Sequence, residues 1–144
     1  MVGIVIAAHG QLASELLATA QLIIGEFASV TSCNLSHSLS PQAIEEELQQ
    51  AIALVDQGEG VLVLADLIGG TPCTRSMALC RKAQLEVVTG VNLPMVLKAH
   101  SLRQNRTLRE LAQQLVEAVR GSIRWVTESE APRVSVAHGH ATSS

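Results

Sequence analysis

Apolar residues follow two alternating patterns along the chain. Short continuous apolar runs rich in Val, Ile and Leu predict strands that are covered on both faces. These runs occupy residues 2–8, 30–35, 61–65, 85–89 and 123–127. Between them, apolar residues recur every three or four positions, which predicts amphipathic helices. The helical stretches occupy residues 11–24, 41–55 and 72–82, a segment around 95–97, and residues 108–119.

This alternation of strands and helices with short connections predicts an α/β fold. Crossover connections of this kind produce a three-layer sandwich, in which a mostly parallel open sheet carries helices on both faces. Residues 1–127 account for the whole pattern, so we expect one domain there. Residues 128–144 are polar and small, and we expect them to form a flexible C-terminal tail or the start of a linker.

The helix predicted from residue 72 begins with a clear signal. Thr71 is expected to be the N-cap and Pro72 the first helical residue, as in the Ser40-Pro41 pair that starts the preceding helix. Three further residues of this helix are spaced three and four apart, which we interpret as core packing; they are Cys73, Met77 and Cys80.

Composition narrows the possible functions. A hydrophobic content of 47% with only 1% aromatic residues predicts an aliphatic core. A net charge of −3 with scattered Lys and Arg argues against nucleic-acid binding. No apolar run approaches the ~20 residues of a membrane span, and the first run lacks the flanks of a signal peptide. Three cysteines without a CxxC spacing fit free thiols in a reducing cytosol, so we expect a cytoplasmic protein.

Two polar residues stand where predicted strands end. His9 closes the first apolar run, and Asp66 directly follows the run at 61–65. Open α/β sheets build their ligand crevices at the carboxyl ends of strands. If the two strands are neighbours, the carboxylate faces the imidazole. Accepting a hydrogen bond from Nδ1–H would then leave the Nε2 lone pair of His9 as the nucleophile.

A glycine turn follows Asp66. Gly69, Gly70 and Thr71 precede a helix, and such a turn presents backbone N–H groups and a hydroxyl to an anion. Each signal alone is weak, but phosphoryl transfer needs a nucleophile, a group that orients it and an anion cradle together. The chain has neither a GxxxxGK[ST] motif nor a GxGxxG motif after its first strand. We therefore expect no cofactor, and a phosphoryl donor that is another protein.

Three segments together resemble a known family. Residues 4–10 (IVIAAHG), 66–72 (DLIGGTP) and 89–95 (TGVNLPM) are similar to the signature segments of the mannose-type IIA domain of the bacterial phosphoenolpyruvate-dependent sugar phosphotransferase system. The resemblance extends over about residues 1–127. Cys73 and Thr74 depart from it, since the family often has Phe and Asn there.

The resemblance implies a phosphotransferase component. His9 would be the phosphorylated histidine, Asp66 its hydrogen-bond partner and Thr71 the hydroxyl of the phosphate loop, to which we add Gly10, Gly69 and Gly70 as phosphate-binding residues. HPr would donate the phosphoryl group, a IIB component would accept it, and membrane subunits IIC and IID would use it indirectly for sugar uptake. The family dimerises through an exchanged C-terminal strand, here residues 123–127, which we expect to be antiparallel. No second domain follows, so a separate IIA subunit peripheral to a membrane transporter is expected.

Other histidines and arginines are weaker candidates. His37 lies after the second predicted strand and is a candidate for the rim of the crevice, although a solvated loop histidine is the more common explanation of such a position. His138 and His140 lack further ligands for a metal site, so we assign no metal. A group of three arginines is a candidate for the active face or for a solvated helix surface; it comprises Arg103, Arg106 and Arg109.

Several alternatives remain open at this stage. A IIA-like phosphocarrier that serves a phosphotransferase-dependent dihydroxyacetone kinase would use the same histidine. A binding module without catalysis would leave His9 unphosphorylated. A thiol enzyme would need Cys73 to face His9, and a receiver-like domain phosphorylated on Asp66 would need acidic residues after the first strand, where the chain has Ala7 and Ala8. The sequence does not specify the sugar, because selectivity in such systems resides in the membrane subunits.

Overall fold

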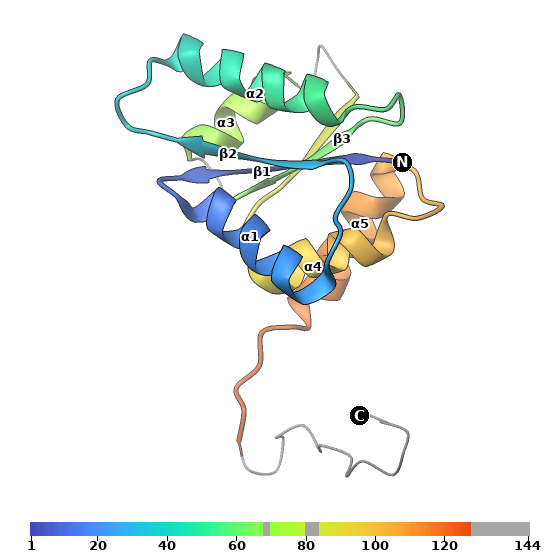
Figure 1. The fold of residues 1–144 in the computed structure, drawn as a ribbon. Helices are drawn as coiled ribbons and strands as arrows, with labels where there is room; N and C mark the ends of the chain where they lie inside the picture. The colour runs from blue at the N-terminus through green and yellow to red at the C-terminus, as the bar shows by residue number, and fades with distance from the viewer. Residues whose placement is uncertain (68–69, 80–83, 128–144) are drawn as a thin grey trace.

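A four-stranded parallel sheet forms the centre of the structure, a computed structural model that describes residues 1–67, 70–79 and 84–127 (Figure 1). The strands lie in the order β2-β1-β3-β4, and every neighbouring pair is parallel. Their bounds are β1 Gly3–His9, β2 Val30–Leu35, β3 Val61–Ala65 and β4 Leu85–Val88. The predicted parallel open sheet is therefore confirmed.

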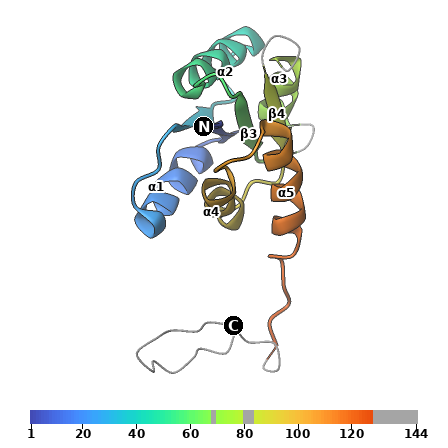
Figure 2. The ribbon, with the colours of Figure 1, turned by 90° about the vertical axis from the view of Figure 1, so that its right-hand side faces the viewer.

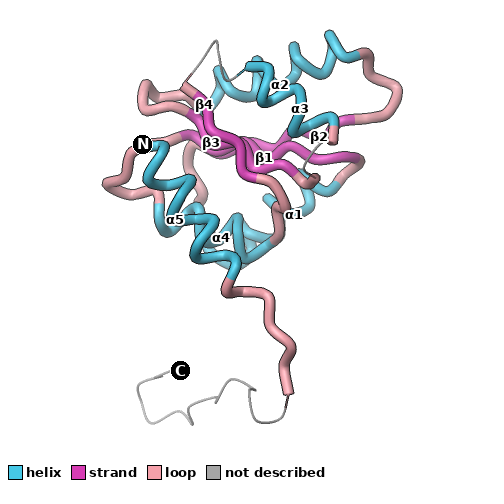
Figure 3. Tube along the Cα trace, turned by 180° about the vertical axis from the view of Figure 1, so that it is seen from behind, coloured by secondary structure: helices cyan, strands magenta, loops and turns pink. Residues whose placement is uncertain are grey.

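In the part of the chain that the structure describes, five helices cover the two faces of this sheet. Helices α1, α4 and α5 lie on one face, and α2 and α3 lie on the other (Figures 2 and 3). Their bounds are α1 Leu12–Ile24, α2 Pro41–Val55, α3 Thr71–Leu79, α4 Leu93–Leu102 and α5 Leu108–Arg120. The resulting three-layer arrangement is the one that the alternating sequence pattern predicts.

The central strand β1 explains why its apolar run has no polar interruptions. Ile4 and Ile6 pack into the core under α1, α4 and α5, whereas Val5 and Ala7 pack into the core under α2. Alternate side chains of a strand point to opposite faces, so a sheet covered on both sides buries all of them. Gly3 is also required by close packing, because a Cβ there would lie 2.4 Å from the carbonyl oxygen of Val55.

Helix starts agree closely with their sequence signals, with one shift. The Ser40 hydroxyl accepts a hydrogen bond from Ala43 N–H at 3.1 Å, as an N-cap does. At α3, however, the Gly70 carbonyl accepts the first helical hydrogen bond, from Thr74 N–H at 2.9 Å. Gly70 thus occupies the N-cap position and Thr71 is the first helical residue, so the helix begins one position earlier than predicted.

The buried face of α3 also differs from the prediction. Its buried side chains recur every third position, at Cys73, Ser76 and Leu79. Met77 therefore lies outside this stripe and is 60% exposed, so its interpretation as a core residue is wrong. Cys80 lies outside the described residues.

The segment after α5 forms no strand within the described chain. Residues 123–127 run as an extended segment away from the body of the molecule (Figure 1). Trp125 is 86% exposed, and Ile123 and Val126 are exposed as well. A strand needs a neighbour for its backbone hydrogen bonds, and the sheet formed by the described residues contains only β2, β1, β3 and β4. The tail predicted at residues 128–144 lies outside the described residues.

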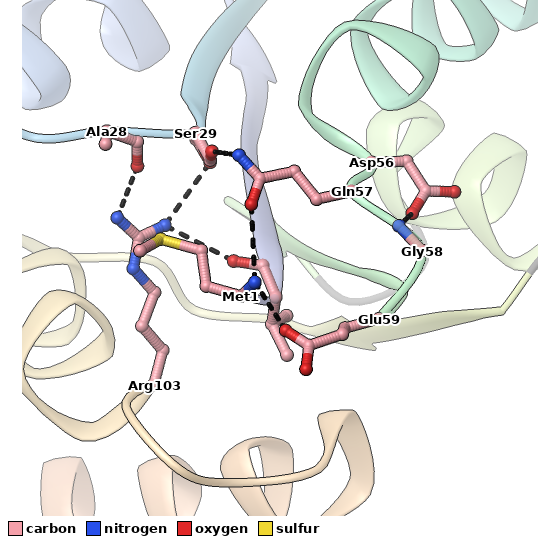
Figure 4. A network of polar contacts seen from close by, with 9 residues as sticks. Met1, Ala28, Ser29, Asp56, Gln57, Gly58, Glu59 and Arg103 are labelled. Carbon is pink, nitrogen blue, oxygen red and sulfur yellow. Dashed lines mark hydrogen bonds and ion pairs between the residues drawn. The ribbon is translucent and has the colours of Figure 1, made fainter.

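Arg103 connects the loops at the amino end of the sheet. It is 3% exposed and donates hydrogen bonds to the carbonyls of Val2 and Ser29, both at 3.3 Å, and to that of Ala28 (Figure 4). Its guanidinium also lies 5.1 Å from the ring centre of Phe27. Because His9 ends β1 at the opposite edge of the sheet, the hypothesis that Arg103 lines the active face is wrong.

Candidate functional site

The His9 side chain is placed by the end of β1 and faces the end of β3. Strands β1 and β3 pair directly, with Ala7 opposite Ala65. His9 is the last residue of β1, and Asp66 immediately follows β3. Parallel strands present their carboxyl ends at one edge of the sheet, so the two side chains meet there. The prediction that these strands are neighbours is confirmed.

The Asp66 carboxylate fixes the orientation of the imidazole. One oxygen, Oδ2, accepts the backbone N–H of His9 at 3.0 Å and lies 2.7 Å from His9 Nδ1. The other oxygen, Oδ1, accepts the backbone N–H of Leu67 at 2.9 Å. With Nδ1 engaged by the carboxylate, Nε2 is the ring nitrogen that remains for a reacting partner.

The same contacts set the charge of the carboxyl group. Burial alone would raise the pKa of Asp66, whose side chain is only 11% exposed. The hydrogen bonds from the His9 backbone and ring, the charge of His9 and the Leu67 N–H together outweigh burial and lower the pKa of Asp66 below its ordinary value. Asp66 is therefore ionised near neutral pH and able to stabilise a positively charged imidazole.

Gly70 allows the loop after β3 to lie against the imidazole. A Cβ at this position would be 3.2 Å from His9 Cε1 and 3.1 Å from Leu67 Cβ, both tighter than usual contacts. The Gly70 N–H donates to the Leu67 carbonyl at 3.3 Å, which closes the turn. Gly69, predicted to bind phosphate with Gly70, lies outside the described residues.

Gly10 shapes the turn that follows His9. Its φ of +61° lies in the left-handed region that glycine tolerates, which lets the chain turn from β1 into α1. Its N–H donates to the Leu35 carbonyl at 3.2 Å. This hydrogen bond closes the turn beside His9, as the Gly70 N–H closes the turn after β3. Phosphate binding by Gly10 stays a prediction.

A small pocket opens beside the imidazole. It has a volume of about 190 Å³, and we call it the His9 pocket. The residues that line it are His9, Leu35, Ser36, His37, Leu39, Pro41, Ile44, Thr71 and Arg75. His37 lies at its rim with its ring centre 5.8 Å from that of His9, as the sequence suggested. A larger hollow of about 700 Å³ lies at the other end of the molecule, near Arg103 and far from His9 and His37.

Arg75 is the lining residue that sequence analysis missed. It follows Thr71 by four positions, which places both side chains on one face of α3. Its Nη1 lies 3.2 Å from Oε1 of Glu45 on α2, so an ion pair connects the two helices at the edge of the pocket. Its spacing of four from Thr71 was the only signal in the sequence that Arg75 lines the pocket, and most helical arginines with partly exposed side chains line no site.

The two cysteines among the described residues, Cys33 and Cys73, do not line this pocket. The Cys73 side chain is buried and lies 3.8 Å from the sulfur of Met77, so it does not face His9 as a thiol enzyme would require. Burial and the charge of Glu47 raise the pKa of Cys33 to about 11, which keeps that thiol protonated. Among the described residues, no group of three or more His, Cys, Asp or Glu side chains is arranged to hold a metal ion.

Comparison with known proteins identifies the class of this fold and site. Residues 3–116 match the family described as "PTS system fructose IIA component". The fructose-specific EIIA component of Bacillus subtilis is 28% identical over 116 residues, which cover 80% of each chain. The mannose-specific EIIAB component of Escherichia coli K12 is 31% identical over 125 residues, covering 85% of this chain but only 39% of that longer protein.

A solved structure gives the same result for the fold. The mannose/sorbose-specific IIA subunit of Enterococcus faecalis superposes with a TM-score of 0.79 at 29% identity, covering 88% of this chain and 95% of that one. The chain belongs to the mannose/fructose family of IIA components of the sugar phosphotransferase system. The resemblance stated from three sequence segments is thereby confirmed. No helix in the described part of the chain has the length and apolarity to cross a membrane.

Proposed function

We propose that this chain is a phosphohistidine carrier that accepts a phosphoryl group from phospho-HPr on His9 and passes it to a IIB component. The observation that carries the proposal is the 2.7 Å contact between His9 Nδ1 and Asp66 Oδ2 beside a small open pocket. This contact favours the tautomer with the proton on Nδ1 and the lone pair on Nε2.

The transfer step uses the Nε2 lone pair. Nε2 attacks phosphorus, a nitrogen–phosphorus bond forms, and the bond between phosphorus and the donor atom of phospho-HPr breaks, leaving its electron pair on that atom. The His9 ring becomes an imidazolium that keeps its Nδ1 proton, and the Asp66 carboxylate stabilises the positive charge. Transfer to the IIB component reverses these events with a new acceptor.

Residues at the start of α3 complete the site. Thr71 lines the pocket beside His9, where its hydroxyl is available to donate to a phosphoryl oxygen. The amino terminus of α3, with Gly70 and Gly69 preceding it, favours negative charge at the same place. His37 borders this space, where it would contact the arriving partner.

The partners and setting follow from the same proposal. Relatives in this family are named for fructose, mannose and mannose/sorbose, so membership of the family does not specify the sugar. We expect a cytoplasmic subunit at the periphery of a membrane transporter with IIC and IID components. We also propose that the exposed segment 123–127 pairs with the open edge of a second copy's sheet in a homodimer.

Phosphorylation of purified protein tests the central claim. Incubation with phosphoenolpyruvate, enzyme I and HPr should yield an acid-labile, base-stable phosphohistidine. His9→Ala should abolish labelling, whereas His37→Ala, which removes the imidazole at the rim of the same pocket, should still be labelled. Labelling of His9→Ala to the wild-type extent would disprove the assignment.

A further inference from the structure

The His9 pocket contains one side chain with a permanent positive charge. Among the nine residues that line it, Arg75 alone carries a cation at every ordinary pH, because its guanidinium does not deprotonate in proteins. Arg75 and Thr71 lie one turn apart on α3, so the guanidinium and the hydroxyl border the same 190 Å³ space. His9 and Arg75 line the same small pocket, so a group attached to His9 that enters it would approach the guanidinium.

A phosphoryl group would change the charge balance of this pocket. A phosphoryl group carries a charge of about −1.5 to −2 near neutral pH. Asp66 already places a carboxylate 2.7 Å from the other nitrogen of the same ring. The Thr71 hydroxyl and backbone amides are neutral donors, and the imidazolium supplies only one compensating charge. A nearby guanidinium would therefore lower the free energy of the phosphorylated state more than that of the free state.

The present partner of Arg75 leaves it free to change partners. The ion pair with Glu45 is 3.2 Å long, and its side chains are 33% and 31% exposed. Ion pairs with this exposure contribute about 0–1 kcal/mol. A guanidinium has five N–H donors in a planar fork and binds phosphate oxygens in a bidentate manner. A dianionic phosphoryl group in a partly enclosed pocket competes effectively with such a carboxylate.

We propose that Arg75 is a phosphoryl-binding residue that releases Glu45 and donates to the phosphoryl oxygens when His9 is phosphorylated. This rests on the proposed function of His9 as the phosphoryl carrier. The exchange stabilises the phosphorylated carrier and leaves the Glu45 carboxylate unpaired on the surface of α2. Phosphorylation is thereby coupled to the charge of the surface that surrounds the pocket.

The test measures the equilibrium constant for phosphorylation, because contacts with the donor protein change the rate of transfer but not this constant. Wild type and variants are equilibrated with enzyme I, HPr and fixed ratios of phosphoenolpyruvate to pyruvate, and the phosphorylated fraction is measured. Arg75→Gln should lower the equilibrium constant for phosphorylation about tenfold, the loss expected for a hydrogen bond to a charged group. Arg75→Lys should recover part of it. Glu45→Gln, which removes the competing carboxylate, should raise it severalfold.

Arg109→Gln is the matched control, since Arg109 is exposed on α5, on the other face of the sheet. It should equal wild type. The Nε–H resonance of Arg75 provides a direct second readout and should shift on phosphorylation of wild type. If wild type is labelled on His9 but Arg75→Gln keeps the wild-type equilibrium constant, even with slower transfer, the role of Arg75 is disproved and the carrier function stands. If wild type is not labelled at all, the proposed function itself fails.

Discussion

Replacing Asp66 with asparagine tests the group that holds His9. In the native site Oδ2 faces two donors of His9, the backbone N–H and Nδ1, and Oδ1 accepts the Leu67 N–H. Asparagine replaces one of these oxygens with an NH2 group. If the NH2 faces Leu67, two donors oppose each other there. If it faces His9, it opposes the backbone N–H and favours the imidazole tautomer with the proton on Nε2.

The expected loss can be worked out from these contacts. Either orientation removes the negative charge that stabilises the imidazolium formed during transfer. A hydrogen bond to a charged group contributes about 1.5–3 kcal/mol, and each ~1.4 kcal/mol of barrier is tenfold in rate. Because the Asp66 side chain is only 11% exposed, solvent screens this interaction little. We therefore expect Asp66→Asn to slow phosphorylation of His9 by about 10- to 100-fold.

Rapid-quench kinetics with phospho-HPr measures this rate. Asp56→Asn is the matched control, since Asp56 is the only other aspartate of the chain and caps the turn after α2, where it accepts the Gly58 N–H at 2.9 Å. Circular dichroism should show both variants folded. A transfer rate for Asp66→Asn equal to those of wild type and Asp56→Asn would refute the reasoning.

Three further results are expected. Because the pKa of Asp66 is lowered in the folded state, its carboxylate stabilises the fold above about pH 4, the ordinary pKa of an aspartate, and this contribution disappears as the pH falls through the folded pKa. In urea titrations, the difference in unfolding free energy between wild type and Asp66→Asn should therefore shrink as the pH falls below about 4. Arg103→Met should destabilise the fold by about 3 kcal/mol in denaturant, since three carbonyls lose their donor; a change under ~1 kcal/mol would contradict it. Truncation after Gly121 should weaken the dimer in sedimentation, and equal association constants would exclude segment 123–127 from the interface.

The strands were predictable because burial on both faces leaves a direct trace in the sequence. Every residue of β3, from Val61 to Ala65, is buried, so its apolar run has no gap. The start of helix α2 was equally predictable, because Ser40 caps it and Pro41 is its first residue. Local signals of this kind do not depend on the rest of the fold.

Features that depend on distant neighbours were not predictable. Cys73 and Met77 lie four positions apart, a helical spacing that predicts one shared face, yet the packing of α3 buries Cys73 and leaves Met77 exposed. The segment 123–127 has the composition of a strand, but a strand also needs a neighbour, and in the part of the chain that the structure describes the segment does not join the sheet. The periodicity of apolar residues predicts the helix or strand to which a residue belongs, whereas tertiary packing determines which residues its side chain contacts.

Two arginines show why the site could be predicted only in part. His9 and Asp66 lie at the ends of adjacent strands, and sheet topology brings them together from their positions alone. Arg75 meets Glu45 across 30 positions, and Arg103 meets Val2 across 101. Arg103 is buried and donates to backbone carbonyls, which holds the loops together. Arg75 instead pairs with the partly exposed carboxylate of Glu45, which a new anion can replace. Their different surroundings, rather than their common chemistry, place Arg103 in the scaffold and Arg75 beside the His9 pocket.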